Sequence, residues 1–187
     1  MNKIRMIALA ACMAATLDAS AQEQEIRLFS HRGGRMEHDE NTLSAFQASY
    51  DAGYRGFETD IRMTRDGALV ITHDSSLERT TDGTGTVEEK TEAEIRQLAT
   101  KQGNKMMFLD ELLEFLKGKE GLYVEFEMKT KPVELYPEER LHAYCDKLYD
   151  AVMAVKPADA VFVFTSGDYR GLPIKRVVVL DYVFSEM

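Results

Sequence analysis

The sequence is poor in cysteine, in net positive charge and in long apolar runs. Its 187 residues carry 23 lysines and arginines against 32 aspartates and glutamates, which gives a formal net charge of −9. Nucleic acids and anionic membranes are bound by clustered positive charge, so this balance argues against both as partners. No run reaches the roughly 20 apolar residues that an integral membrane span requires. A small anionic substrate still fits if a bound cation recruits it.

The first 21 residues have the pattern of an export signal. Lys3 and Arg5 precede an apolar run over residues 6–17, and Ala19-Ser20-Ala21 predicts cleavage before Gln22. We therefore expect a signal peptide at residues 1–21 and a mature protein, residues 22–187, that is exported to the periplasm or secreted.

A lipoprotein box is the alternative at the same end of the chain. Leu9-Ala10-Ala11-Cys12 resembles such a box, but the apolar run before the cysteine, residues 6–11, is shorter than the roughly 7–15 residues expected there. Anchoring at Cys12 is therefore the less favoured interpretation. After cleavage before Gln22 only Cys145 would remain, so no internal disulfide is expected. Cys145 lies in a helical pattern and is expected to be a buried thiol.

Segments typical of strands alternate with segments of helical periodicity. Strands are predicted at residues 26–30, 56–61, 68–72, 122–129, 160–165 and 176–183. Helices are predicted after a cap at Asn41 or Thr42, from a capping box of Thr91 and Glu94, over residues 110–117, and from Pro137 onward. This alternation indicates a parallel α/β sheet, in which catalytic groups gather at the carboxyl ends of the strands. Glu88 and Glu89 lie in the loop before the capping box of Thr91 and Glu94, and both are expected to be solvated.

The strand at residues 56–61 carries two carboxylates on one face. Alternation places Glu58 and Asp60 on the side opposite to its apolar residues. Two neighbouring carboxylates are costly to bury together. Either this is an edge strand with one solvated face, or a cation lies between the carboxylates, and an oxygen-liganded divalent ion is the simplest candidate.

A third carboxylate comes from the strand at residues 122–129. Its apolar residues are expected to pack against helices, so its charged residues, Glu125, Glu127 and Lys129, face the other side. Glu127 would then join Glu58 and Asp60 around one cation. Three carboxylates without a cysteine favour Mg²⁺ or Ca²⁺ over Zn²⁺.

Six polar motifs follow one another along the chain. They are His31-Arg32-Gly33, Glu40-Asn41-Thr42, Glu58-Thr59-Asp60, His73-Asp74, Arg79-Thr80-Thr81-Asp82-Gly83-Thr84-Gly85 and Glu127-Met128-Lys129. In this order they are similar to the motifs of glycerophosphodiester phosphodiesterases, and the chain resembles that family from about residue 29 to residue 129. The resemblance implies a TIM-type (β/α)₈ barrel in residues 22–187. It also implies metal-dependent hydrolysis of a small-molecule glycerophosphodiester to sn-glycerol 3-phosphate and an alcohol.

The resemblance further implies roles for eight residues at matching positions. Glu58, Asp60 and Glu127 would be the ligands of one Mg²⁺ or Ca²⁺ ion, His31 and His73 the general acid and base, Arg32 and Lys129 the groups that hold the phosphate, and Glu40 a support by hydrogen bonding. The chemistry agrees, because a divalent ion and two cations neutralise the charge that builds on the phosphodiester. Histidine, with a reference pKa of about 6.5, suits both proton transfers.

Each of these residues also has a plainer interpretation. Alone, His31 or His73 is more often a structural histidine, and Arg32 a surface or ion-pair residue. Lys129 could simply neutralise Glu125 or Glu127.

The predicted strands are too few for the implied barrel. About six strands are predicted, whereas a (β/α)₈ barrel has eight and typically about 250 residues. The sequence is therefore expected to be a C-terminally truncated version of a longer protein, with self-association or a shortened fold as alternatives. Two other functions also stay open: a remnant that binds metal and phosphate without turnover, and a lipid-cleaving phospholipase of D or C type.

Overall fold

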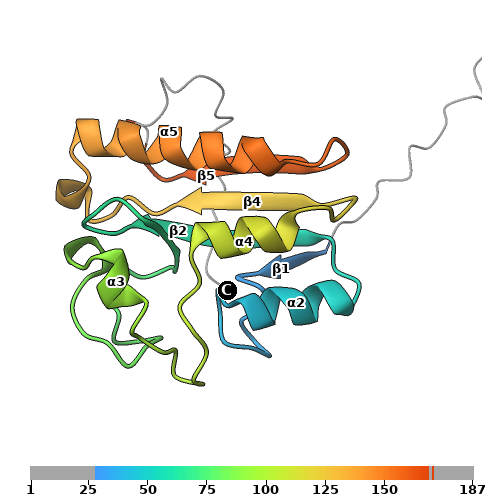
Figure 1. The fold of residues 1–187 in the computed structure, drawn as a ribbon, viewed down its shortest axis with the longest axis horizontal. Coiled ribbons are helices and arrows are strands. Elements are labelled where there is room, and N and C mark those ends of the chain that lie inside the picture. Colours follow the sequence, from blue (N-terminus) through green and yellow to red (C-terminus); the bar gives the residue numbers. More distant parts are fainter. Residues whose placement is uncertain (1–27, 169, 171–187) are drawn as a thin grey trace, which may run out of the picture.

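The computed structural model describes residues 28–168 and residue 170. These residues form one open sheet in the order β1-β2-β4-β5, with β3 paired to β2 outside that path (Figure 1). The strands are β1 (Phe29–His31), β2 (Gly56–Met63), β3 (Leu69–Ile71), β4 (Tyr123–Met128) and β5 (Val161–Ser166). The predicted signal at residues 1–21 and the predicted strand at residues 176–183 lie outside the described part of the chain.

Helices alternate with these strands as predicted. The longer ones are α2 (Leu43–Asp51), α4 (Leu109–Leu116) and α5 (Glu138–Val155), and the short ones are α3 (Glu92–Ile95), η1 (Val87–Glu89) and η2 (Val133–Leu135). Among the described residues, no helix is both long and apolar enough to cross a membrane.

The local signals read from the sequence fix several helix ends. Thr42 caps α2, because its side chain accepts a hydrogen bond from the Ala45 N–H. The predicted capping box of Thr91 and Glu94 is present at α3, and α5 begins directly after Pro137.

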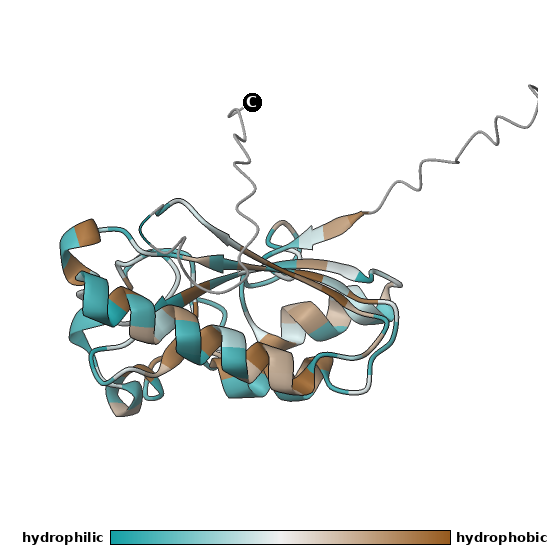
Figure 2. Ribbon diagram, turned by 90° about the horizontal axis from the view of Figure 1, so that it is seen from above, coloured by the Kyte–Doolittle hydropathy of each residue, from teal (hydrophilic) through white to brown (hydrophobic). Residues whose placement is uncertain are grey.

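The three longer helices cover one face of the sheet (Figure 2). Phe57, Ile61, Val124 and Phe126 are fully buried on that face and form the core with the apolar sides of α2, α4 and α5. Cys145 of α5 belongs to this core as a buried free thiol, which confirms its expected place. The alternate residues of β2 and β4, which include the predicted carboxylates, therefore face the other way.

The parallel register sets those carboxylates side by side. Glu58 of β2 lies opposite Glu125 of β4, and Asp60 lies opposite Glu127. The predicted parallel α/β sheet is confirmed for β1, β2, β4 and β5. Within the described residues the sheet has the open edges β1 and β5 and does not close into a barrel.

The strand predicted at residues 68–72 is not a member of the parallel set. It forms β3, which pairs antiparallel with β2 and places Ile71 opposite Ile61. The connection through Gly67 is a tight turn, in which the Thr64 hydroxyl oxygen accepts a hydrogen bond from the Ala68 N–H at 2.9 Å. A parallel return would need a crossover of about a dozen residues. The hairpin therefore continues β2 past its pairing with β4.

The acidic residues before α3 do not share one environment, so the expectation that both are solvated is wrong for Glu88. Its side chain is buried, and its Oε1 lies 2.6 Å from Arg62 Nη1. The Tyr136 hydroxyl donates to the same oxygen at 2.8 Å, and the Ser75 hydroxyl donates to Oε2 at 2.6 Å. The cost of burying a charged side chain is offset when it is paired and hydrogen-bonded in this way. Glu89 is exposed, as expected.

Candidate active site

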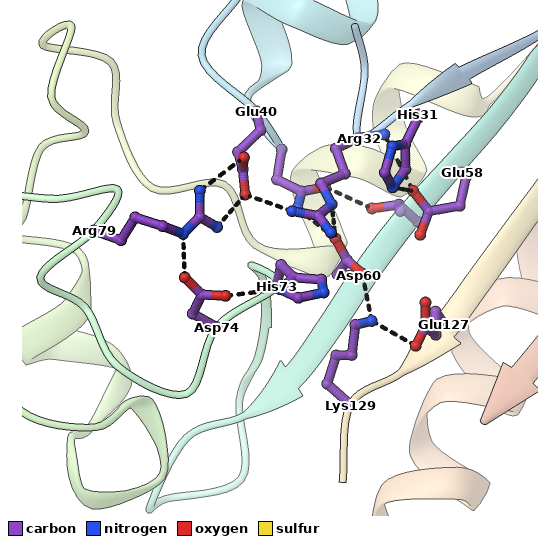
Figure 3. A network of polar contacts seen from close by, with 12 residues as sticks. His31, Arg32, Glu40, Glu58, Asp60, His73, Asp74, Arg79, Glu127 and Lys129 are labelled. Atoms are coloured by element: carbon purple, nitrogen blue, oxygen red, sulfur yellow. Dashed lines mark hydrogen bonds and ion pairs between the residues drawn. The ribbon is translucent and has the colours of Figure 1, made fainter. Parts of the chain in front are cut away.

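All eight residues singled out from the sequence lie in one network of polar contacts near the carboxyl ends of β1 and β4 and beside the middle of β2 (Figure 3). His31 ends β1, Glu58 and Asp60 lie on β2, and Glu127 lies on β4. The remaining members come from the segments that follow β1, β3 and β4. Among the described residues, this network contains the only group of side chains that could hold a metal ion.

Three carboxylates form the centre of the network. Glu58, Asp60 and Glu127 each offer an oxygen, and these oxygens all lie within 4.8 Å of one another. Glu58 and Asp60 share a face because they are two residues apart on β2, and Glu127 is the register partner of Asp60 on β4. The predicted set of three carboxylates is therefore assembled as the sequence indicated.

The charge of this centre is not balanced by hydrogen bonds. Burial, and then the charges of Asp60 and Glu127, raise the pKa of Glu58 to about 9. The Glu58 Oε1 atom is buried and has no hydrogen-bond partner among the described residues. A divalent cation bound by oxygen ligands would satisfy that atom and relieve the repulsion, so these residues fit a hard ion such as Mg²⁺ or Ca²⁺. The group contains no cysteine, so it differs from the thiolate-rich sites typical of structural zinc.

Two cations flank Asp60. Lys129 Nζ lies 3.1 Å from Asp60 Oδ1, and Arg32 Nε lies 3.2 Å from Asp60 Oδ2. Both contacts are ion pairs outside hydrogen-bond geometry, because Asp60 Oδ1 and Arg32 Nε have no hydrogen-bond partner. Lys129 also binds Glu127, as one of the plainer interpretations expected. Asp60 is fully buried, and the positive charges of Arg32 and Lys129 offset part of the cost of burying its carboxylate.

The backbone of Arg32 adopts a conformation that is rare for a non-glycine residue. Its φ is 54°, and its N–H lies 3.1 Å from both the Glu58 carbonyl oxygen and Glu58 Oε2. Gly33 follows with φ +76°, and a Cβ at this position would lie 2.9 Å from Phe46 Cδ2. The turn therefore needs glycine both for its dihedral angle and for its space, and it directs the Arg32 side chain toward Asp60.

Asn41 is a site residue that the sequence identified only as a possible helix cap. Its Nδ2 donates to Asp60 Oδ2 at 2.9 Å, and its own φ is 59°, a conformation that asparagine tolerates. The signal was its place in the motif Glu40-Asn41-Thr42. Asn41 therefore fixes one carboxylate oxygen of Asp60, while Thr42 provides the cap of α2.

The two histidines lie on different sides of the carboxylates. His31 Nε2 is 3.6 Å from Glu58 Oε2, and half of the His31 side chain is exposed. Burial and the nearby charges of Arg32 and Arg35 lower the pKa of His31. His73 instead binds Asp74, with Nδ1 2.7 Å from Asp74 Oδ1.

Glu40 connects the two halves of the network. Its Oε1 accepts from Arg32 Nη1 at 3.1 Å, and both of its oxygens accept from Arg79. Arg79 in turn binds Asp74, the partner of His73. The supporting hydrogen bonds expected of Glu40 are present. Asp74 and Arg79 belong to motifs quoted from the sequence, but their place in the site could not be read from spacing.

The sequence model of the glycerophosphoryl diester phosphodiesterase family matches residues 31–168. The chain belongs to this family. The network of Figure 3 lies within the matched region.

Relatives and solved structures agree with the family membership. A glycerophosphodiester phosphodiesterase of Caldanaerobacter subterraneus subsp. tengcongensis is 37% identical over 157 residues, which cover 80% of this chain and 62% of the relative. A glycerophosphodiester phosphodiesterase of Bacillus altitudinis is 30% identical over 118 residues, which cover 59% of this chain and 48% of the relative. The chain thus spans about half to three-fifths of the length of these relatives.

Two solved structures are similar in fold. A putative glycerophosphoryl diester phosphodiesterase of Silicibacter pomeroyi DSS-3 has a TM-score of 0.70 at 26% identity and covers 79% of this chain and 59% of its own. A phosphodiesterase of Oleispira antarctica, solved with the product sn-glycerol-3-phosphate, has a TM-score of 0.69 at 26% identity and covers 79% and 60%. The open sheet described above therefore corresponds to part of the TIM barrel of this family.

Proposed function

We propose that this protein binds one divalent cation, Mg²⁺ or Ca²⁺, and hydrolyses glycerophosphodiesters to sn-glycerol 3-phosphate and an alcohol. The observation that carries the proposal is the centre of three carboxylates, Glu58, Asp60 and Glu127, whose oxygens lie within 4.8 Å of one another. The family membership of residues 31–168 supports the class of substrate. The product bound to the Oleispira antarctica relative supports sn-glycerol 3-phosphate as the product here.

The residues around the carboxylates supply the parts that phosphodiester hydrolysis requires. A bound divalent cation would supply positive charge to the anionic phosphodiester and so favour attack on phosphorus. Arg32 and Lys129 already lie beside Asp60 and would hold the phosphate oxygens. His31 and His73 would divide the two proton transfers: one takes the proton of the attacking hydroxyl, and the other protonates the leaving alcohol. Each transfer typically contributes about 10²–10⁴ in rate.

We also propose that residues 1–21 direct export, because a charged start, an apolar run and a small-residue cleavage site follow one another there. Mass spectrometry of the protein recovered from the periplasmic and cytosolic fractions of a bacterial host tests this proposal. A first residue of Gln22 is expected, and an uncut amino terminus in the cytosolic fraction would refute it.

Metal binding is tested first by thermal unfolding of chelator-treated protein with added Mg²⁺ or Ca²⁺. A ligand at 100 times its dissociation constant stabilises the native state by about 2.7 kcal/mol, which corresponds to a rise in Tm of about 5–10 °C at this size. Glu127→Gln should abolish the rise. Glu125→Gln is the matched control, because Glu125 lies two residues away on the same strand and outside the carboxylate centre. An equal response of both variants would contradict the site.

Turnover is tested with glycerophosphocholine and the other common head groups, with and without a chelator. Metal-dependent release of sn-glycerol 3-phosphate is expected, and His31→Ala and Glu58→Gln should each lower the rate by about 10²-fold or more. Glu125→Gln should keep the rate of the unaltered protein. Metal-dependent stabilisation without any hydrolysis would refute the enzyme and favour the alternative function, binding of metal and phosphate without turnover.

A further inference from the structure

Arg79 joins Glu40 to Asp74, and neither the proposed metal site nor the proposed phosphate contacts include it. Its guanidinium lies between two carboxylates (Figure 3). Nη2 is 2.6 Å from Glu40 Oε1, Nη1 is 3.0 Å from Glu40 Oε2, and Nε binds Asp74 Oδ2. All three of its nitrogens are therefore engaged by protein oxygens, so the side chain is placed to position other groups rather than to contact the substrate.

We propose that Arg79 is a positioning residue that holds His73 in a single tautomer and connects it, through Glu40, to Arg32. The inference rests on the proposed function, because the tautomer of His73 matters to hydrolysis only if His73 transfers a proton.

The tautomer follows from the state of Asp74. Burial raises the pKa of Asp74, but hydrogen bonds from Arg79 and His73 outweigh burial and lower it to about 2. An ionised carboxylate only accepts hydrogen bonds, so the Nδ1 atom of His73, 2.7 Å from Asp74 Oδ1, must carry the proton. The neutral ring then has its lone pair on Nε2, on the side away from Asp74 (Figure 3). This is the arrangement of a general base that a carboxylate orients.

Arg79 controls this arrangement because it binds the second oxygen of Asp74. With Oδ2 held by Arg79, Oδ1 is the oxygen presented to His73. Without Arg79 the carboxylate could rotate, and the fixed direction of the His73 contact would be lost. The hydrogen bonds to Glu40 and Asp74 also raise the pKa of Arg79, so its charge is present at every working pH.

The Nη1 and Nη2 atoms of Arg79 bind Glu40, which in turn contacts Arg32, one of the two proposed phosphate-binding residues. Glu40 Oε1 accepts from both Arg79 Nη2 and Arg32 Nη1, at 2.6 and 3.1 Å. Burial raises the pKa of Glu40, but the hydrogen bond and charge of Arg79, together with Arg32, outweigh burial and lower it. Glu40 therefore remains an anion between two guanidinium groups, and Arg79 and Arg32 keep a fixed relation.

The loop that carries Arg79 is anchored independently of the guanidinium. Leu77 is buried in the smaller core cluster, and the Thr81 N–H and hydroxyl both donate to the Leu77 carbonyl oxygen, at 3.0 and 2.7 Å. About half of the Arg79 side chain is exposed, so its removal opens no cavity. Substitution should therefore change the orientation of Asp74 and His73 while the fold remains.

The plainer interpretation is that Arg79 forms ordinary surface ion pairs, which contribute little. A matched control is Arg65, whose side chain is 59% exposed and pairs with Glu94 in the hairpin turn, away from the network. Arg79→Gln and Arg65→Gln remove the same charge and differ only in what the guanidinium holds. Asp74→Asn and the double variant Asp74→Asn/Arg79→Gln complete a mutant cycle.

The first measurement is the ¹⁵N spectrum of the histidine rings in the full chain at pH 8.5, about two units above the reference pKa of imidazole, with His73 assigned through His73→Gln. The unaltered protein and Arg65→Gln should show His73 protonated on Nδ1. Arg79→Gln should show a mixture of tautomers. Arg79→Gln with the same His73 spectrum as Arg65→Gln would overturn the proposal, even if Tm falls.

The second measurement is the kinetics of glycerophosphodiester hydrolysis. Arg79→Gln should lower kcat by about tenfold or more and change KM by less than about threefold, and the double variant should be no worse than Asp74→Asn alone. Additive losses would overturn the proposal, because Arg79 would then act independently of Asp74. The spectrum requires no turnover, so an inactive unaltered chain would refute the proposed function, and the spectrum would still decide how Arg79 acts on His73.

Discussion

Replacing Glu88 by glutamine tests the buried ion pair beneath the candidate site. Glu88 accepts hydrogen bonds from Arg62 Nη1 at 2.6 Å, from the Tyr136 hydroxyl at 2.8 Å and from the Ser75 hydroxyl at 2.6 Å. Arg62 also donates to the carbonyl oxygens of His73 and Lys131. Glutamine has nearly the same shape as glutamate but no charge, so the substitution leaves the Arg62 charge buried without its partner.

The expected cost follows from what remains after the change. Removal of one partner of a buried ion pair typically costs about 3–5 kcal/mol, because the other charge stays buried. The amide oxygen of glutamine can still accept from Arg62 and Tyr136, and the Ser75 hydroxyl can accept from the new amide group. Because these hydrogen bonds and the side-chain volume are kept, we expect no destabilisation beyond this range. A free energy of unfolding lower by about 3–5 kcal/mol corresponds to a fall in Tm of about 6–20 °C.

The assay is urea unfolding followed by circular dichroism, with the slope of the transition compared between variants. Glu89→Gln is the matched control, because Glu89 is the next residue, is exposed, and undergoes the same change. Its free energy of unfolding should stay within about 0.5 kcal/mol of that of the unaltered protein. If Glu88→Gln falls in that same range with an unchanged slope, the buried pair does not stabilise the fold and the reasoning is refuted.

Two further predictions concern the carboxylate centre and the turn beside it. Because the pKa of Glu58 is raised from 4.5 to about 9, the native metal-free protein binds more protons than the unfolded chain between these values, and its stability should fall as pH rises through that window. Unfolding in a chelator from pH 5 to 9 measures this fall, and an equally steep fall in Glu58→Gln would show that another group causes it. Gly33→Ala should cost about 1–3 kcal/mol more than Gly118→Ala, because both positions have φ above +70° but only at Gly33 would a Cβ lie 2.9 Å from Phe46. Equal losses in urea unfolding would contradict the steric argument.

The helices and most strands of the described chain followed from local patterns. The apolar spacing in α4 and α5, the Thr42 cap of α2 and the capping box of α3 each act within a few residues, so they can be read directly from the sequence. The direction of β3 was missed, because the strand pattern of residues 68–72 is the same in either direction. The short turn through Gly67 was the available signal, since no parallel crossover fits there.

The site was predictable as a set of residues and not as a network. Alternation along β2 and β4 placed the carboxylates on one face, and the motifs named the histidines and the cations. Glu88 was mistaken for a solvated residue, because an acidic pair in a loop gives no sign that a buried arginine 26 positions earlier will meet one member of the pair. Asn41 and Arg79 were likewise quoted as motif positions without their partners.

The sequence by itself determined the periodicities, the caps and the family motifs, because each depends on neighbouring residues or on residue type. Only the tertiary structure decided which charges share a space. The parallel register of β2 and β4 sets Asp60 beside Glu127, and the hairpin β2–β3 returns the chain so that His73 and Asp74 reach the same edge. These contacts join residues up to about 70 positions apart, and their geometry depends on strand order and register. Neither is written in the local pattern of any one segment.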